Sequence, residues 1–140
     1  MESDSLILVV DDDPQNIQML GTLLRNEKYQ VSIAMNGQQA LERVRHASPD
    51  LILLDVLMPD MDGIETCKRL KEEENSRNVP VIFLTALSDV ADINKGFDVG
   101  GVDYVTKPFN APELLRRVET QLKLYKTSKE LARLKNRLDR

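Results

Sequence analysis

The fold of this chain is decided by its first apolar run, Leu6-Ile7-Leu8-Val9-Val10, which ends in the acidic triplet Asp11-Asp12-Asp13. Three later runs have the same form, in which a strand-like apolar segment ends at a chemically capable side chain. They are residues 50–55 ending in Asp55, residues 80–85 ending in Thr85, and residues 102–106 followed by Lys107. The carboxyl ends of parallel strands share one edge of an open sheet, and ligands bind there. We therefore expect these side chains to meet in one crevice.

Strand-like and helix-like segments alternate five times, which predicts an α/β fold with helices on both faces of a parallel sheet. The expected strands lie near residues 6–10, 30–35, 50–55, 80–85 and 102–106. The first, third and fourth are almost continuously apolar, as strands buried on both faces are. The second and fifth alternate and are expected at the edges. The pattern favours a flavodoxin-like, doubly wound five-stranded sheet of order 2-1-3-4-5 with five helices.

Three helices carry start signals, in which a short polar residue precedes a favourable partner. The pairs are Asp13 with Pro14, Asn36 with Gln39, and Asn110 with Glu113. The fourth helix, expected near residues 89–99, is weaker because Gly96 lies inside it, and a helical glycine costs about 1 kcal/mol relative to alanine. Gly100-Gly101 is expected to end it.

The last helix does not stop where a compact domain would end it. Beyond Tyr125 the chain continues without Gly or Pro, and four leucines fall on a and d positions of a heptad. These are Leu124, Leu131, Leu134 and Leu138. We expect residues 1–125 to form the main domain and residues 126–140 a helical extension. The extension is a solvated basic tail, a helix that pairs with a second copy, or a linker to an output domain; two heptads do not decide among these.

The bulk composition limits the classes of function. The net charge of −4 and the pI near 5.1 argue against binding of nucleic acid or an anionic membrane by this segment. No apolar run approaches the roughly 20 residues of a membrane span, and the N-terminus lacks the features of a signal peptide. One cysteine, Cys67, cannot form an internal disulfide, so a cytoplasmic location is expected.

Asp11, Asp12 and Asp55 are the decisive candidates for chemistry. Carboxylates brought within about 4–6 Å raise one another's pKa, so their clustering is unfavourable without a cation. Mg²⁺ reverses this, because it binds one or two carboxylates, waters and phosphate oxygens. The sequence therefore predicts a magnesium site that handles a phosphoryl group.

Four motifs together resemble the receiver domain of two-component response regulators, including chemotaxis regulators. They are Val9-Val10-Asp11-Asp12, the run from Leu53 to Gly63 around Asp55, Leu84-Thr85-Ala86, and Asp103-Tyr104-Val105-Thr106-Lys107-Pro108-Phe109. The resemblance covers roughly residues 5–125. It implies a phosphoacceptor signalling domain rather than an enzyme, with self-phosphorylation and autodephosphorylation as its chemistry. It also implies a sensor histidine kinase or phosphotransfer protein as partner.

The resemblance assigns roles residue by residue. Asp55 would attack the phosphorus of a phosphohistidine and become an aspartyl phosphate. Asp11, Asp12 and Asp55 would hold Mg²⁺, together with the backbone carbonyl of Leu57. Lys107, with an implied cis bond to Pro108, would stabilise the charge that develops on the phosphoryl oxygens.

Two residues are expected to transmit the signal. The Thr85 hydroxyl would bond the phosphoryl oxygen, and Tyr104 would then turn inward. This would reshape the face formed by the fourth helix, fifth strand and fifth helix, a second surface at which a homodimer could form. Leu57 and Leu87 follow Asp55 and Thr85 by two residues, and neither can position an attacking water. We therefore predict a long-lived aspartyl phosphate.

Three other functions fit these residues less well. A phosphatase would use Asp11 and Asp13, but Gln15 stands where such enzymes usually have Thr or Val. A binding module with idle phosphorylation machinery is disfavoured because the active-site positions are all filled. Dinucleotide binding lacks the Gly-rich turn that it needs.

Overall fold

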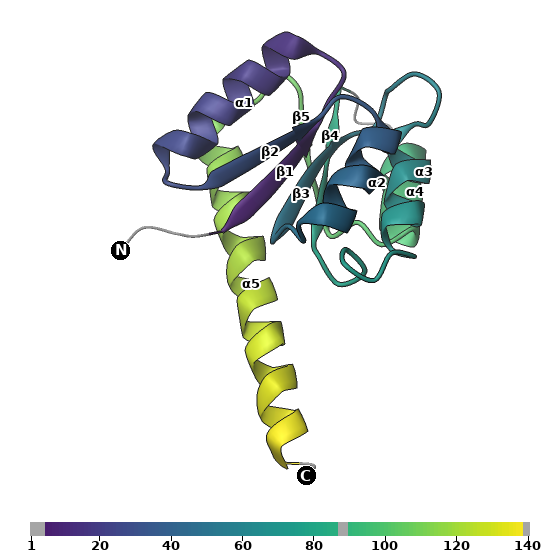
Figure 1. Cartoon of the computed structure of the whole chain (residues 1–140). Coiled ribbons are helices and arrows are strands. Elements are labelled where there is room, and N and C mark those ends of the chain that lie inside the picture. The colour runs from purple at the N-terminus through teal and green to yellow at the C-terminus, as the bar shows by residue number, and fades with distance from the viewer. Residues whose placement is uncertain (1–4, 87–89, 139–140) are drawn as a thin grey trace.

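Five parallel strands form one sheet in the order β2-β1-β3-β4-β5, which confirms the expected topology (Figure 1). The strands are β1 Leu6–Val10, β2 Gln30–Ala34, β3 Leu51–Asp55, β4 Val81–Thr85 and β5 Asp103–Thr106. The helices are α1 Pro14–Asn26, α2 Gly37–His46, α3 Gly63–Leu70, α4 Val90–Asp98 and α5 Ala111–Leu138. The computed structural model describes residues 5–86 and 90–138, the side chains of residues 90–92 excepted.

Helices cover both faces of the sheet, which explains why its central strands are apolar throughout. Successive side chains of a strand point to opposite faces. Ile7 and Leu53 pack in the core under α1 and α5, whereas Leu8 and Leu54 pack in the core under α2 and α3. The edge strands β2 and β5 are less buried, as their alternating pattern predicted.

Short polar side chains begin the helices as expected. Asp13 accepts a hydrogen bond from the backbone N–H of Gln15, and Asn36 and Asn110 each accept one from the backbone N–H three residues on. Asp62 caps α3 in the same way, by accepting a hydrogen bond from the backbone N–H of Glu65. Each such cap stabilises its helix by about 1 kcal/mol.

The fourth helix ends at two glycines, as predicted. Gly100 has a φ of 111°, and the N–H groups of Gly100 and Gly101 bond back to the carbonyls of Phe97 and Gly96. Gly96 has a packing reason to lie inside the helix, because a Cβ there would come within 2.7 Å of the Phe83 ring. Strand β5 starts at Asp103 rather than at residue 102.

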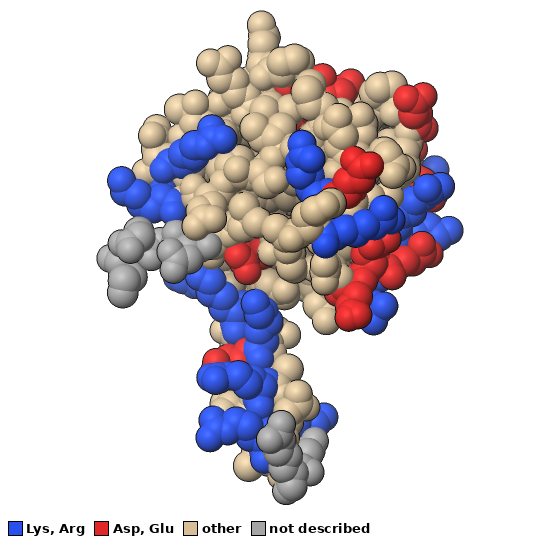
Figure 2. All heavy atoms as spheres, in the orientation of Figure 1, with Lys and Arg blue, Asp and Glu red and all other residues tan. Residues whose placement is uncertain are grey.

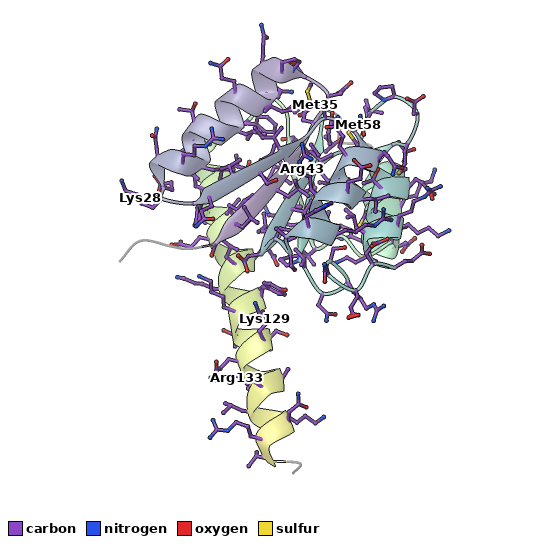
Figure 3. The ribbon with its side chains drawn as sticks, viewed as in Figure 1. Lys28, Met35, Arg43, Met58, Lys129 and Arg133 are labelled. Atoms are coloured by element: carbon purple, nitrogen blue, oxygen red, sulfur yellow. The ribbon has the colours of Figure 1, made fainter. Side chains whose placement is uncertain are left out.

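Helix α5 is one continuous helix that packs on the sheet and then runs on past it (Figure 1). Leu114, Val118 and Leu122 are buried, whereas residues 126–138 are all exposed. We call residues 124–138 the stem. Basic side chains cluster along it (Figure 2), including the labelled Lys129 and Arg133 (Figure 3). Neither α5 nor any other helix in the described part of the chain combines the length and apolar character needed to cross a membrane.

Candidate functional site

The predicted residues do converge at the carboxyl edge of the sheet. Asp11 follows β1, Asp55 is the last residue of β3, and Thr85 is the last residue of β4. Lys107 follows β5, and its backbone N–H donates to the Thr85 carbonyl at 2.7 Å. Residues far apart in sequence therefore share one edge because the strands are parallel and in register.

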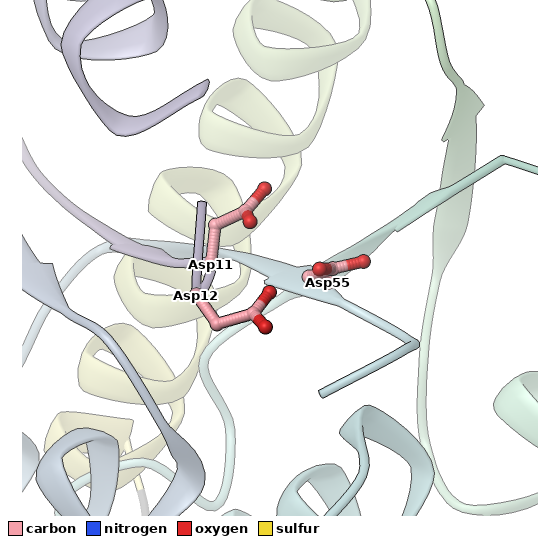
Figure 4. Close-up of side chains that lie close together, drawn as sticks. All are labelled: Asp11, Asp12 and Asp55. Atoms are coloured by element: carbon pink, nitrogen blue, oxygen red, sulfur yellow. The ribbon is translucent and has the colours of Figure 1, made fainter. Parts of the chain in front are cut away.

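Three carboxylates form the acidic cluster of the site (Figure 4). Asp11, Asp12 and Asp55 each bring one carboxylate oxygen within 4.8 Å of those of the other two. Asp11 and Asp55 are buried, with 0% and 4% of their surface exposed, whereas Asp12 faces solvent. The cluster is therefore open on the side of Asp12 and closed beneath Asp11 and Asp55.

Lys107 places a cation against the two buried carboxylates. Its Nζ lies 3.2 Å from Asp55 Oδ1 and 3.4 Å from Asp11 Oδ2. The Lys107–Pro108 peptide bond is cis, as the resemblance implied. One ammonium thus faces two carboxylates, which leaves the site with excess negative charge.

That excess changes the acidity of Asp55. Burial, and then the neighbouring charge of Asp11, raise the pKa of the Asp55 carboxyl from 3.8 to about 6. Lys107 and the backbone N–H of Leu57, which lies 3.3 Å from Asp55 Oδ1, offset part of this increase. The ionised carboxylate that a nucleophile requires is therefore destabilised unless another cation joins the site.

The oxygen donors fit a small divalent cation. Mg²⁺ binds oxygens at about 2.0–2.1 Å, so ligands on opposite sides of the ion lie about 4 Å apart. The separations within the cluster, all at or below 4.8 Å, are close to this span. The donors are all hard carboxylate oxygens, which Mg²⁺ prefers.

Hydrogen bonds that the sequence did not reveal hold Asp11 in place. Its Oδ1 accepts from the backbone N–H of Asp13 at 2.9 Å, and its Oδ2 accepts from Asn16 Nδ2 at 3.3 Å. The signal in the sequence was a pair of polar residues, Gln15 and Asn16, in the first turn of α1. The Asp13 side chain instead caps α1, so the second acid that the phosphatase alternative requires lies outside the cluster.

Gly63 is a second residue whose importance the sequence did not reveal. Its N–H donates to the Val56 carbonyl at 2.8 Å, and a Cβ on it would lie 2.2 Å from the Asp55 carbonyl oxygen. Only glycine allows α3 to start this close to the end of β3. The Asp62-Gly63 pair therefore does more than turn the chain, because it fixes the position of the backbone that carries Asp55.

The two candidate switch residues line one small cavity. Thr85 and Tyr104 face it together with Val56, Phe83 and Phe97. The Phe97 ring meets the Tyr104 ring edge-on, with centroids 6.4 Å apart and planes at 72°. The cavity has a volume of only about 10 Å³, so Tyr104 can turn into it only if Thr85 moves away.

Of the two apolar positions expected to slow dephosphorylation, Leu57 lies beside Asp55. Leu57 is 62% exposed, and its backbone N–H lies 3.3 Å from Asp55 Oδ1. Leu87 lies outside the described residues.

Comparison with known proteins gives the same assignment. Residues 7–119 match the response regulator receiver domain family. The chain is 44% identical over 117 residues to the DNA-binding response regulator MtrA of Mycolicibacterium smegmatis, which covers 84% of this chain and 50% of MtrA. The chain thus spans about half the length of this relative.

Solved structures agree with the fold and with the site. The Vibrio cholerae chemotaxis protein CheY4 superposes with a TM-score of 0.82 at 30% identity, over 85% of this chain and 99% of that one. The receiver domain of the sensor histidine kinase PA1611 from Pseudomonas aeruginosa gives 0.80 at 32% identity, over 86% and 99% of the two chains, and holds a magnesium ion in its active-site cleft. This chain therefore belongs to the response regulator receiver domain family, a phosphoacceptor signalling module rather than a classical enzyme.

Proposed function

We propose that Asp55 is the phosphoacceptor of this receiver. The observation that carries the proposal is the position of its carboxylate, buried at the sheet edge between the Lys107 ammonium and the carboxylates of Asp11 and Asp12. An Asp55 oxygen attacks the phosphorus of a phosphohistidine, so an O–P bond forms and the N–P bond breaks. The imidazole leaves and takes a proton from solvent, and an aspartyl phosphate remains.

The neighbouring groups have distinct roles in this proposal. Lys107 stabilises the charge on the phosphoryl oxygens, because its ammonium already lies within 3.4 Å of both buried carboxylates. Asp11, Asp12 and Asp55 would hold Mg²⁺, with the carbonyl of Leu57 as a further ligand. When bound, Mg²⁺ would neutralise the charge of the carboxylates and of the incoming phosphoryl group.

Thr85 and Tyr104 transmit the phosphorylation of Asp55 to the surface of the domain. The Thr85 hydroxyl bonds a phosphoryl oxygen and moves toward Asp55, and Tyr104 then turns into the cavity that both residues line. This movement withdraws Tyr104 from Phe97 on α4. The output is a changed surface over α4, β5 and α5, a two-state response of the kind that phosphorylation biases.

Phosphorylation with a small donor tests the assignment of Asp55. Incubation with acetyl phosphate and Mg²⁺ should add one phosphate to the chain, detected by intact-mass spectrometry. The Asp55→Asn variant should add none, and EDTA should prevent the addition to the wild type. An equal adduct on Asp55→Asn, or none on the wild type, would refute the proposal.

The phosphoryl donor is proposed to be a histidine kinase or phosphotransfer protein that docks in a groove beside the site. Met19 and Leu23 of α1 line this groove together with Phe109 and Ala111. Helix α1 starts directly after the acidic triplet and Phe109 follows Lys107-Pro108, so an occupant lies next to Asp55. The lining carries no charge, which suits an uncharged helix face of the donor. Such donors place the chain in the cytoplasm.

Comparing two phosphoryl donors, a kinase and acetyl phosphate, distinguishes an effect on kinase docking from an effect on the phosphorylation reaction itself. Met19→Lys should slow phosphotransfer from an autophosphorylated kinase core of the same organism but leave the reaction with acetyl phosphate unchanged. Val102→Lys is the matched control, because Val102 is comparably exposed but precedes β5 at the opposite end of the sheet. Equal slowing by both variants would remove the groove from the proposal.

We also propose that residues 1–125 act as the receiver and residues 126–140 as an extension through which the chain forms a homodimer. The exposed leucines of the stem support the homodimer. A domain that follows the stem would then be held close to its counterpart in the second copy.

A further inference from the structure

The stem carries an apolar stripe that no described residue covers. Leu124, Leu131, Leu134 and Leu138 are 59%, 61%, 41% and 85% exposed. Their spacings of seven, three and four residues place them on one side of the helix. Burial of exposed leucine side chains is favourable, so the stripe fits the apolar face of a second helix.

The charged residues beside the stripe favour a second copy of the stem as the partner. With Leu124, Leu131 and Leu138 at a and Leu134 at d, Glu130 occupies a g position and Lys135 the following e position. In a parallel, in-register pair, each g position faces the next e position of the other helix. Glu130 therefore faces Lys135 of the second copy, and symmetry makes this contact twice. Glu130 is the one acidic residue among five basic ones in the stem.

The leucines themselves also favour the parallel arrangement. Parallel alignment sets each of the four leucines against the same leucine of the other copy. An antiparallel alignment centred on Leu131 and Leu134 sets Leu138 against Thr127 in both copies. In the parallel pair, every leucine of the stripe therefore packs against a leucine. The two Thr127 side chains meet each other and form the one polar layer.

We infer that the stem forms a parallel, in-register coiled coil with the stem of a second copy, with register set by Glu130 and Lys135 across the interface. This rests on the proposed homodimer and is independent of phosphorylation at Asp55. The stripe between Leu124 and Leu138 extends over about 21 Å at 1.5 Å per residue. So short a coil gives a weak, concentration-dependent dimer.

Sedimentation equilibrium of the 140-residue chain tests the pairing. The wild type should move from monomer to dimer with rising concentration. Leu131→Lys should remain monomeric, and Asn136→Lys should dimerise as the wild type does, because position 136 faces away from the stripe. A wild type that stays monomeric at millimolar concentration overturns both the inference and the proposed homodimer, and leaves the role of Asp55 intact.

Cysteine crosslinking tests the orientation. Leu138→Cys should form an intermolecular disulfide under mild oxidation, whereas Asn136→Cys should not. Cys67 does not compete, because it is buried and its pKa is raised to about 11 by burial. In the antiparallel pair, the two positions 138 lie about 16 Å apart along the axis, beyond the reach of a disulfide. A dimer that crosslinks only when Thr127→Cys and Leu138→Cys are combined in one chain overturns the parallel orientation.

A charge exchange tests the register. Glu130→Lys and Lys135→Glu should each weaken the homodimer about three- to tenfold, since two symmetric surface pairs become repulsive. An equimolar mixture of the two variants should form mainly the mixed dimer, in which both contacts are again attractive. A statistical mixture of dimers overturns the assigned register.

Discussion

At the scale of single residues, the ionised form of Asp55 costs folding stability, because the carboxylate is buried beside Asp11. Its pKa is raised from 3.8 to about 6 in the folded chain, so the folded state binds this proton more tightly than the unfolded state. Without divalent cations, the free energy of unfolding should therefore fall as pH rises through this window and stay lowered above it.

Asp55→Asn should remove this penalty. At pH 7.5 in EDTA, we expect the variant to be more stable than the wild type by about 3 kcal/mol, with the gain lost as the pH falls below the unfolded value of 3.8. Urea titrations followed by circular dichroism measure the difference. Glu42→Gln, a neutralisation on the exposed surface of α2, is the control and should change stability little. A gain that is independent of pH would show that charge at Asp55 is not its cause.

A second prediction concerns the residue at the mouth of the site. The Leu57 side chain is exposed beside Asp55 and cannot orient a water molecule. Leu57→Asn should shorten the lifetime of the aspartyl phosphate by about tenfold, less than a general base achieves, because an amide only positions the attacking water. Loss of radiolabelled phosphate measures the lifetime. Leu57→Met should decay as the wild type does, and an unchanged or longer lifetime for Leu57→Asn would contradict the prediction.

At the scale of elements, the start of α3 and the end of β3 are packed backbone against backbone. A Cβ on Gly63 would lie 2.2 Å from the Asp55 carbonyl oxygen, whereas a Cβ on Gly21 within α1 would meet only the flexible end of Arg25. The same substitution at the two glycines should therefore have opposite effects.

Gly63→Ala should destabilise the fold by about 2–3 kcal/mol and slow phosphorylation by acetyl phosphate, because Asp55 must shift. Gly21→Ala should stabilise it by about 0.5–1 kcal/mol, the usual gain from alanine in a helix, and leave phosphorylation unchanged. Thermal unfolding and intact-mass kinetics give both measurements. Equal effects at the two positions would mean that the contact with β3 does not constrain the site.

At the scale of the whole molecule, the acidic cluster exists only when β1 and β3 are paired, so a cation that binds it should bind the folded chain alone. MgCl₂ at about 100 times its dissociation constant should then stabilise the wild type by about 2.7 kcal/mol, seen as a rise in Tm. Asp12→Asn should reduce this gain, and NaCl of equal ionic strength should not reproduce it. An equal rise with NaCl would indicate screening of charge instead of binding.

Much of this architecture could be predicted from the order of residues. The apolar runs at residues 6–10 and 51–54 predicted strands buried on both faces, and the acids that follow them predicted the edge where the site lies. These predictions succeed because strand periodicity, capping and the shared edge of parallel strands are local or topological rules. The flavodoxin-like order follows from them, whereas the receiver family was indicated by the resemblance of the four motifs and is shown by the family match.

Other features depend on contacts between segments that are distant in sequence. The pKa of Asp55 results from burial and from Asp11 and Lys107, and the need for glycine at position 63 results from the backbone of Asp55. Local sequence alone determined which residues could act, because side-chain type and strand ends are properties of the chain itself. Only the tertiary structure decided how strongly they interact, because distance and exclusion of water arise when the elements pack.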